Sequence, residues 1–171
     1  MIKKILITGL PRSGKSTLLE KVIHEIDNKK GFITREVRAN EERTGFEIVT
    51  HDGRKKMLSS VNFKSSYKVS RYFVDVDGLD EIVATLRDYG QELLYIDEIG
   101  QMELFSENFK DLVTNYLNSD NVFIATVSKV YEDDFIRRIK SRKDVLLYEI
   151  TPENRGEKLA EIKDYLKKLL K

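Results

Sequence analysis

The chain has 171 residues and carries 30 lysines and arginines against 29 aspartates and glutamates, for a formal net charge of +1. This length predicts one compact domain with its own hydrophobic core, and the charge balance argues against a strongly basic surface for nucleic acid or membranes. The absence of cysteine excludes disulfide frameworks, thiolate zinc sites and thiol catalysis. Pro11 and Arg12 interrupt the short apolar run at the N-terminus too early for a signal peptide, so we expect a cytoplasmic protein.

Short apolar runs alternate with amphipathic stretches along the chain. Apolar residues spaced three and four apart predict helices, and short runs rich in β-branched and aromatic residues predict strands. In chain order we expect a strand at residues 4–8, a helix at 15–26, strands at 31–37, 45–50, 55–58 and 72–76, a helix at 77–89, a strand at 93–97, a helix at 106–118, a strand at 121–127, a helix at 133–140, a strand at 145–150 and a helix at 152–170. This order predicts an α/β fold, with a mostly parallel central sheet and helices on both faces, built as a single domain over residues 1–171.

Three local features refine this outline. Strand-like runs separated by a polar loop and a tight turn predict a β-hairpin or meander, inserted at residues 31–58. The polar, serine-rich stretch at residues 59–70 predicts a mobile loop. Thr151 followed by Pro152 predicts the start of the last helix, because proline is favoured at the first helical position.

The strongest motif lies between the first strand and the first helix. Residues 9–16 read Gly-Leu-Pro-Arg-Ser-Gly-Lys-Ser and match the phosphate-loop pattern G-x-x-x-x-G-K-S/T at every fixed position. In such a loop the backbone amides and the helix dipole bind phosphate oxygens, and the lysine, here Lys15, reaches the β- and γ-phosphates. The hydroxyl of Ser16 is expected to bind Mg²⁺. The residues expected to bind the nucleotide here are Gly9, Leu10, Pro11, Arg12, Ser13, Gly14, Lys15, Ser16 and Thr17.

A second signal is a pair of acids at the end of an apolar strand. Asp97 and Glu98 follow the run Leu-Leu-Tyr-Ile. Ligands collect at the carboxyl ends of parallel strands, so Asp97 is expected beside the phosphate loop, where it holds Mg²⁺ through a water. Glu98 points in another direction and is free to orient and deprotonate a water in line with the γ-phosphate. We therefore predict Glu98 and Lys15 as catalytic residues, Asp97 and Glu98 as part of the nucleotide site, and Ser16 and Asp97 as metal ligands.

Longer stretches accompany these motifs: GFITREVRANEERTGFEIVT at 31–50, YIDEIGQMELFS at 95–106 and TPENR at 151–155. Together with the phosphate loop they resemble the small P-loop nucleoside-triphosphatases known from thermophiles and as cancer-related nucleoside-triphosphatase. The resemblance spans nearly the whole chain. It implies a P-loop α/β domain with a β-hairpin insertion, and Mg²⁺-dependent hydrolysis of ATP, GTP and other nucleoside triphosphates to diphosphate and phosphate. Gln101 departs from it, because lysine is expected there; if that lysine neutralises phosphate charge, this chain needs another cation.

Several further residues remain open candidates. Arg12 is long enough to reach the nucleotide, with a solvated side chain as the alternative. Thr126 is a candidate sensor of the γ-phosphate, or a simple hydroxyl at a strand end. Asn154 is a candidate for the ribose or base, or a helix cap. Transition-state charge on the γ-phosphoryl group usually needs an additional cation. The arginines that offer one, each with a surface ion pair as the alternative, are Arg38, Arg43, Arg138, Arg142 and Arg155.

These residues favour Mg²⁺-dependent hydrolysis of nucleoside triphosphates. The resemblance also implies loose base selectivity, and the lack of a suitably placed N-K-x-D base-reading motif agrees with it. One alternative is a small nucleotide or metabolite kinase, for which no acceptor-binding motif is found. Another is a nucleotide-gated binding module. The expected partner is the nucleoside triphosphate, a monomer is favoured, and neither a membrane nor nucleic acid is indicated.

Overall fold

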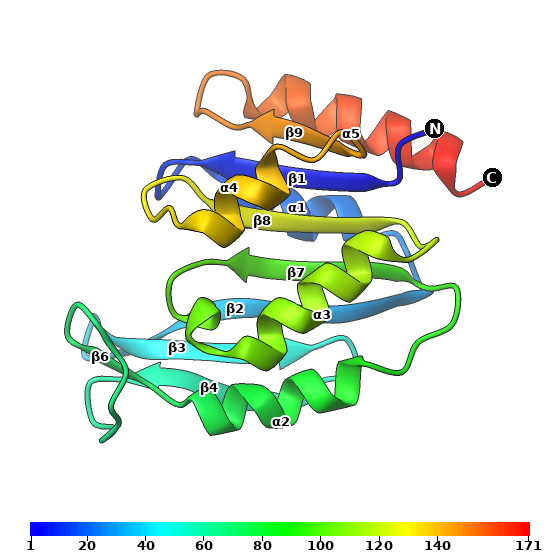
Figure 1. Cartoon of the computed structure of the whole chain (residues 1–171). Helices are drawn as coiled ribbons and strands as arrows, with labels where there is room; N and C mark the ends of the chain where they lie inside the picture. The colour runs from blue at the N-terminus through cyan, green and yellow to red at the C-terminus, as the bar shows by residue number, and fades with distance from the viewer.

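A nine-stranded sheet forms the centre of the molecule, with helices on both of its faces (Figure 1). The computed structural model describes all 171 residues. The strands are β1 (Lys4–Gly9), β2 (Lys29–Ala39), β3 (Glu42–Thr50), β4 (Lys55–Ser60), β5 (Lys68–Val69), β6 (Tyr72–Val74), β7 (Leu93–Ile99), β8 (Phe123–Ser128) and β9 (Val145–Glu149). The helices are α1 (Lys15–Ile23), α2 (Val76–Leu86), α3 (Glu107–Asn118), α4 (Asp134–Lys140) and α5 (Arg155–Leu169), with a 3₁₀ turn, η1, at Glu103–Phe105.

The sheet has a parallel half and an antiparallel half, in the order β5-β6-β4-β3-β2-β7-β8-β1-β9. The strands β2, β7, β8, β1 and β9 run parallel to their neighbours within that group. The strands β3, β4, β6 and β5 continue the sheet from β2 in antiparallel pairs. The strand β2 joins the halves, because its first residues pair with β7 and its later residues pair with β3. The α/β fold with helices on both faces is therefore confirmed.

The sheet divides the apolar core into two layers. The helices α2, α3 and α4 pack on one face of the sheet and form the larger buried cluster. The helices α1 and α5 pack on the other face. The amphipathic spacing of each helix explains this burial, since α3 turns Phe109, Leu112 and Tyr116 toward the sheet. None of the helices has the length and apolar character needed to cross a membrane.

Several element boundaries differ from the prediction. The helix α5 begins at Arg155, not at Pro152. Thr151 and Asn154 instead close a turn, because the backbone amide of each donates to the side-chain oxygen of the other, at 2.8 and 3.2 Å. These reciprocal bonds are those of a capping box, and the Arg155 amide donates to the Thr151 carbonyl oxygen at 3.1 Å. Thr151 therefore caps the turn that leads into α5, as predicted, and only the first residue of the regular helix differs from the prediction.

The predicted loop at 59–70 is partly strand. Ser59 and Ser60 belong to β4 and pair with β6, and the two residues of β5 pair with the other side of β6. Polar composition hid this pairing, because Ser59 and Ser60 are buried between neighbouring strands although serine is mostly an exposed residue.

The strand β7 is longer than predicted. It continues past Asp97 through Glu98 to Ile99, so both acids belong to the strand. The helix α1 is shorter than predicted and ends at Ile23.

Candidate active site

The phosphate loop connects β1 to α1 at the carboxyl ends of the parallel strands. Gly9 leaves no room for a side chain, since a Cβ there would lie 2.6 Å from the carbonyl oxygen of Ile150. Gly14 has φ of 98°, a left-handed conformation that favours glycine. It also stands at the N-cap of α1, where it has no side chain to bond the first amides of the helix. These amides and the helix dipole form an anion-binding end.

Lys15 lies at the centre of the site. Its Nζ donates a hydrogen bond to the carbonyl oxygen of Gly9 at 3.0 Å and forms an ion pair with Glu98 Oε2 at 3.2 Å. Only 12% of the Lys15 side chain is exposed, compared with 32% of the Glu98 side chain. The lysine charge is therefore held between the loop and the carboxylate, at the position where phosphate oxygens approach in phosphate-loop proteins.

Asp97 is buried between the loop and two neighbouring strands. Its Oδ1 accepts hydrogen bonds from Ser16 Oγ at 3.1 Å and from Thr126 Oγ1 at 2.6 Å. Its backbone carbonyl accepts one from Thr34 Oγ1 at 2.7 Å. Burial raises the pKa of Asp97 to about 6. The negative charge of Glu98 also raises this pKa, whereas the hydrogen bonds from Thr126 and Ser16 lower it.

The other carboxylate oxygen of Asp97, Oδ2, is buried and has no hydrogen-bond partner. Because Asp97 Oδ1 accepts a hydrogen bond from Ser16, the Ser16 hydroxyl and the unbonded Asp97 Oδ2 lie close to each other. No cluster of three or more His, Cys, Asp or Glu side chains that could hold a metal is found. Such a sparse oxygen set fits Mg²⁺, which keeps several waters and takes its remaining ligands from one or two protein groups and from substrate phosphates.

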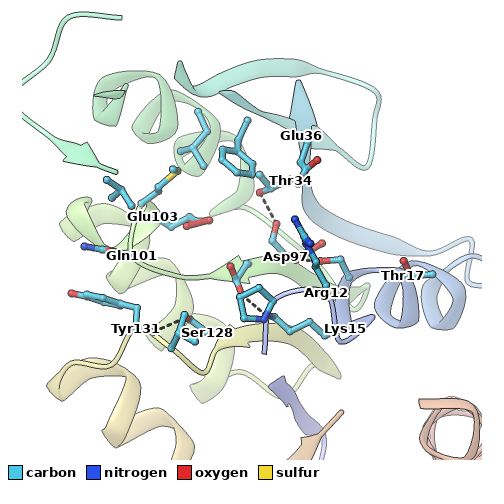
Figure 2. Close-up of a pocket in the computed structure, with 18 of the residues that line it drawn as sticks. Arg12, Lys15, Thr17, Thr34, Glu36, Asp97, Gln101, Glu103, Ser128 and Tyr131 are labelled. Atoms are coloured by element: carbon cyan, nitrogen blue, oxygen red, sulfur yellow. Dashed lines mark hydrogen bonds and ion pairs between the residues drawn. The ribbon is translucent and has the colours of Figure 1, made fainter. Parts of the chain in front are cut away.

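A cavity of about 500 Å³ opens beside the loop (Figure 2). The predicted site residues that line it are Pro11, Arg12, Gly14, Lys15, Ser16, Thr17, Asp97 and Glu98. Three residues of the predicted loop, Gly9, Leu10 and Ser13, are not among its lining residues. Gly9 and Ser13 instead form the base of the loop, and Leu10 is exposed to solvent.

The far wall of the cavity is formed by residues that were not among the predicted site residues. It includes Phe46 and Leu58 from β3 and β4, together with Glu103 and Tyr131. Glu103 is almost fully buried, and burial raises its pKa well above the usual value, with the nearby Glu98 charge acting in the same direction. Glu103 lies within the predicted stretch 95–106, but nothing in the sequence distinguishes a buried acid from a solvated one.

The open candidates divide clearly in the structure. Thr126 contacts Asp97 and so positions the carboxylate. The Asn154 side chain is occupied in the 151–154 turn and also donates to the Glu149 carbonyl. Gln101 lines the cavity.

None of the arginine candidates outside the loop lines the cavity. Arg38 and Arg43 both pair with Glu36, at 3.0 and 3.1 Å. Arg142 pairs with Asp144, and the side chain of Arg155 packs against Gly14. For Arg38, Arg43 and Arg142 the structure therefore shows the surface ion pair that was the alternative to a contact with the nucleotide.

The phosphate loop, the acid pair of β7 and the strand order define the class: a P-loop nucleoside-triphosphatase fold. A family model described as NTPase matches residues 4–163. The nucleoside-triphosphatase THEP1 of Thermotoga maritima is 42% identical over 167 residues, which cover 96% of this chain and 95% of that protein.

Two solved structures are also similar. THEP1 from the hyperthermophile Aquifex aeolicus has a TM-score of 0.82 and 38% identity, covering 93% of this chain and 96% of that one. The human cancer-related nucleoside triphosphatase has a TM-score of 0.83 and 31% identity, covering 96% and 97%. The chain belongs to this NTPase family, as the sequence motifs predicted.

Proposed function

We propose that the protein hydrolyses nucleoside triphosphates to nucleoside diphosphate and phosphate, with Mg²⁺ as its cofactor. Its membership of a family whose relatives are named nucleoside-triphosphatases supports the hydrolysis itself. The observation that carries the proposal for this chain is the meeting of Lys15, Asp97 and Glu98 in one cavity beside the phosphate loop.

The protein groups divide the work as follows. The loop amides and Lys15 bind the phosphate chain and offset its negative charge. Ser16 and, through water, Asp97 would hold Mg²⁺, which would supply positive charge to offset the negative charge of the phosphates. Glu98 orients the attacking water and accepts its proton. The water oxygen bonds to the γ-phosphorus while the bond from that phosphorus to the diphosphate oxygen breaks, and the diphosphate leaves with the electron pair.

Base selectivity is proposed to be loose. Asn154 is bonded within its own turn, and the sequence has no base-reading motif. A cytoplasmic location and a monomeric state also remain predictions, since they rest on composition and not on the site.

A small-molecule kinase is the second candidate function, and the far wall of the cavity favours it. Apolar side chains, among them Phe46 and Leu58, line the same cavity as the acid pair. A triphosphate tail does not need an apolar wall, whereas a phosphoryl acceptor with an apolar body does.

Phosphate release without an acceptor separates the two functions. The wild-type protein is incubated with γ-labelled ATP or GTP and Mg²⁺, and free phosphate is measured. A hydrolase turns over repeatedly with both nucleotides, whereas a kinase releases almost no phosphate until an acceptor is added. Chelation of the metal is expected to stop the release and added Mg²⁺ to restore it; release that continues unchanged under chelation contradicts the metal assignment.

A further inference from the structure

The cavity holds a second cation besides Lys15. Arg12 lies in the middle of the phosphate loop, is exposed, and lines the cavity together with Asp97 (Figure 2). Glu98 lines the same cavity. It takes part in none of the ion pairs of the molecule. The guanidinium is therefore free to bind an anion.

The backbone of Arg12 is also unusual. Its φ is 67°, in the left-handed region that side chains other than glycine disfavour. A glycine would adopt this conformation without strain. Strained residues persist when the surrounding structure imposes them, and they gather at functional sites. An arginine held here, at the edge of the cavity, calls for a role that glycine cannot fill.

Other cations do not fill that role. Arg38 and Arg43 are both bound to Glu36 and do not line the cavity. Arg155 packs against Gly14 but is not itself among the lining residues of the cavity. Gln101 occupies a place on the cavity wall but is neutral. Arg12 is therefore the one arginine that the fold places in the cavity.

We propose that the guanidinium of Arg12 contacts the terminal phosphate of the bound nucleoside triphosphate and supplies, within the same chain, the positive charge that a transferring phosphoryl group needs. Guanidinium donates paired hydrogen bonds to phosphate oxygens and stays charged throughout. Other P-loop enzymes take such an arginine from a partner protein or from another part of the chain. No bond to Arg12 forms or breaks and its proton does not move. The inference rests on the proposed hydrolysis.

Three substitutions test this contact. Arg12→Gly removes the charge and relieves the backbone, Arg12→Asn removes the charge with a residue that tolerates the left-handed region, and Arg12→Lys keeps a charge without the paired donors. Arg87→Ala, an exposed arginine far from the loop in sequence and outside the cavity lining, is the control. We measure kcat for phosphate release and the melting temperature of each variant.

The expected loss in kcat is roughly 10- to 100-fold for the glycine and asparagine variants, the range expected for hydrogen bonds to a charged group. The lysine variant is expected to be intermediate and the control unchanged. The melting temperature of Arg12→Gly is expected to equal or exceed that of the wild type, so the loss in kcat does not come from unfolding. A loss smaller than about threefold, less than any charged hydrogen bond costs, overturns the proposal. So does a lysine variant no better than the glycine one.

A binding measurement keeps this inference separate from the hydrolysis proposal. If the wild type released no phosphate, the proposed function would fail, but the contact would still be judged by affinity. Arg12→Gly is expected to weaken binding of a non-hydrolysable triphosphate analogue more than binding of the diphosphate. Equal weakening of both, or no weakening, overturns the contact with the terminal phosphate.

Discussion

The two ends of the parallel strands treat their polar groups in opposite ways. At the amino ends, the side chains are bonded to the protein itself. Lys4 donates to the carbonyl oxygens of Ser119 and Asn121, and the Asn121 amide donates to those of Gly90 and Glu92 at 2.9 and 2.8 Å. This end of the sheet is complete without any ligand.

At the carboxyl ends of the parallel strands, some buried polar side chains have no hydrogen-bond partner. Three buried side-chain oxygens of the protein have no hydrogen-bond partner: Thr8 Oγ1, Ser13 Oγ and Asp97 Oδ2. All three lie in or beside the phosphate loop or on the acid strand. Buried polar groups are normally bonded, so each exception asks for an explanation. The amino-terminal edge of the sheet is thus stabilised by bonds within the protein, whereas the carboxyl-terminal edge keeps polar groups that a ligand can bind.

Substitution of Asp97 is expected to have the largest effect on the carboxyl-terminal edge of the sheet. We expect Asp97→Asn to lower the rate of phosphate release about 10- to 100-fold, the usual effect of losing a group that holds a metal through a metal-bound water. A higher Mg²⁺ concentration for half-maximal rate is expected as well. Asp111→Asn, on the exposed side of α3, is the matched control. Turnover of Asp97→Asn equal to that of the control would contradict the metal role.

The same variant is expected to be more stable than the wild type near neutral pH. Because the folded pKa of Asp97 is raised from 3.8 to about 6, the folded protein binds this proton more tightly than the unfolded chain does. This tighter proton binding stabilises the folded protein at low pH, and the stabilisation is lost as the pH rises from 3.8 to about 6. The free energy of unfolding of Asp97→Asn, measured relative to wild type, should therefore rise with pH over this range, by up to about 1.4 kcal/mol per pH unit. A difference in the free energy of unfolding that does not change with pH would contradict the raised pKa of buried Asp97.

At the amino end the opposite pattern is expected. Asn121→Ala leaves the carbonyl groups of Gly90 and Glu92 without their donor. The free energy of unfolding should fall by about 1–3 kcal/mol, while phosphate release per folded molecule stays at the wild-type rate. Asn62→Ala, an exposed loop asparagine, serves as the control and should change stability by less than about 0.5 kcal/mol. A loss of turnover without loss of stability would erase the difference between the two ends.

Much of the fold was predictable because its signals are local. The spacing of Leu18, Leu19 and Val22 on α1 and the apolar run of β7 each depend on a few neighbouring residues. The phosphate loop and the acid pair were found for the same reason, since their chemistry requires fixed residue types at fixed spacing. The family was confirmed on these stretches.

The remaining parts of the site depend on which strands become neighbours. Thr34 on β2 and Thr126 on β8 reach Asp97 from opposite sides only because β7 lies between these two strands. Periodicity predicts strands but not their order in a sheet. The cap at Thr151 was found from its local sequence, whereas the regular helix α5 starts only at Arg155, after the turn that Thr151 and Asn154 close with their capping bonds.

The most direct test of the account is the role of Glu98. Glu98→Gln keeps the size of the side chain and removes its ability to accept a proton, so kcat for phosphate release should fall roughly 10²- to 10⁴-fold. Nucleotide affinity should be retained or increased, because Lys15 loses its competing ion pair with the carboxylate. A variant that binds nucleotide and hydrolyses it at a near-normal rate would contradict the assignment of Glu98 as the base.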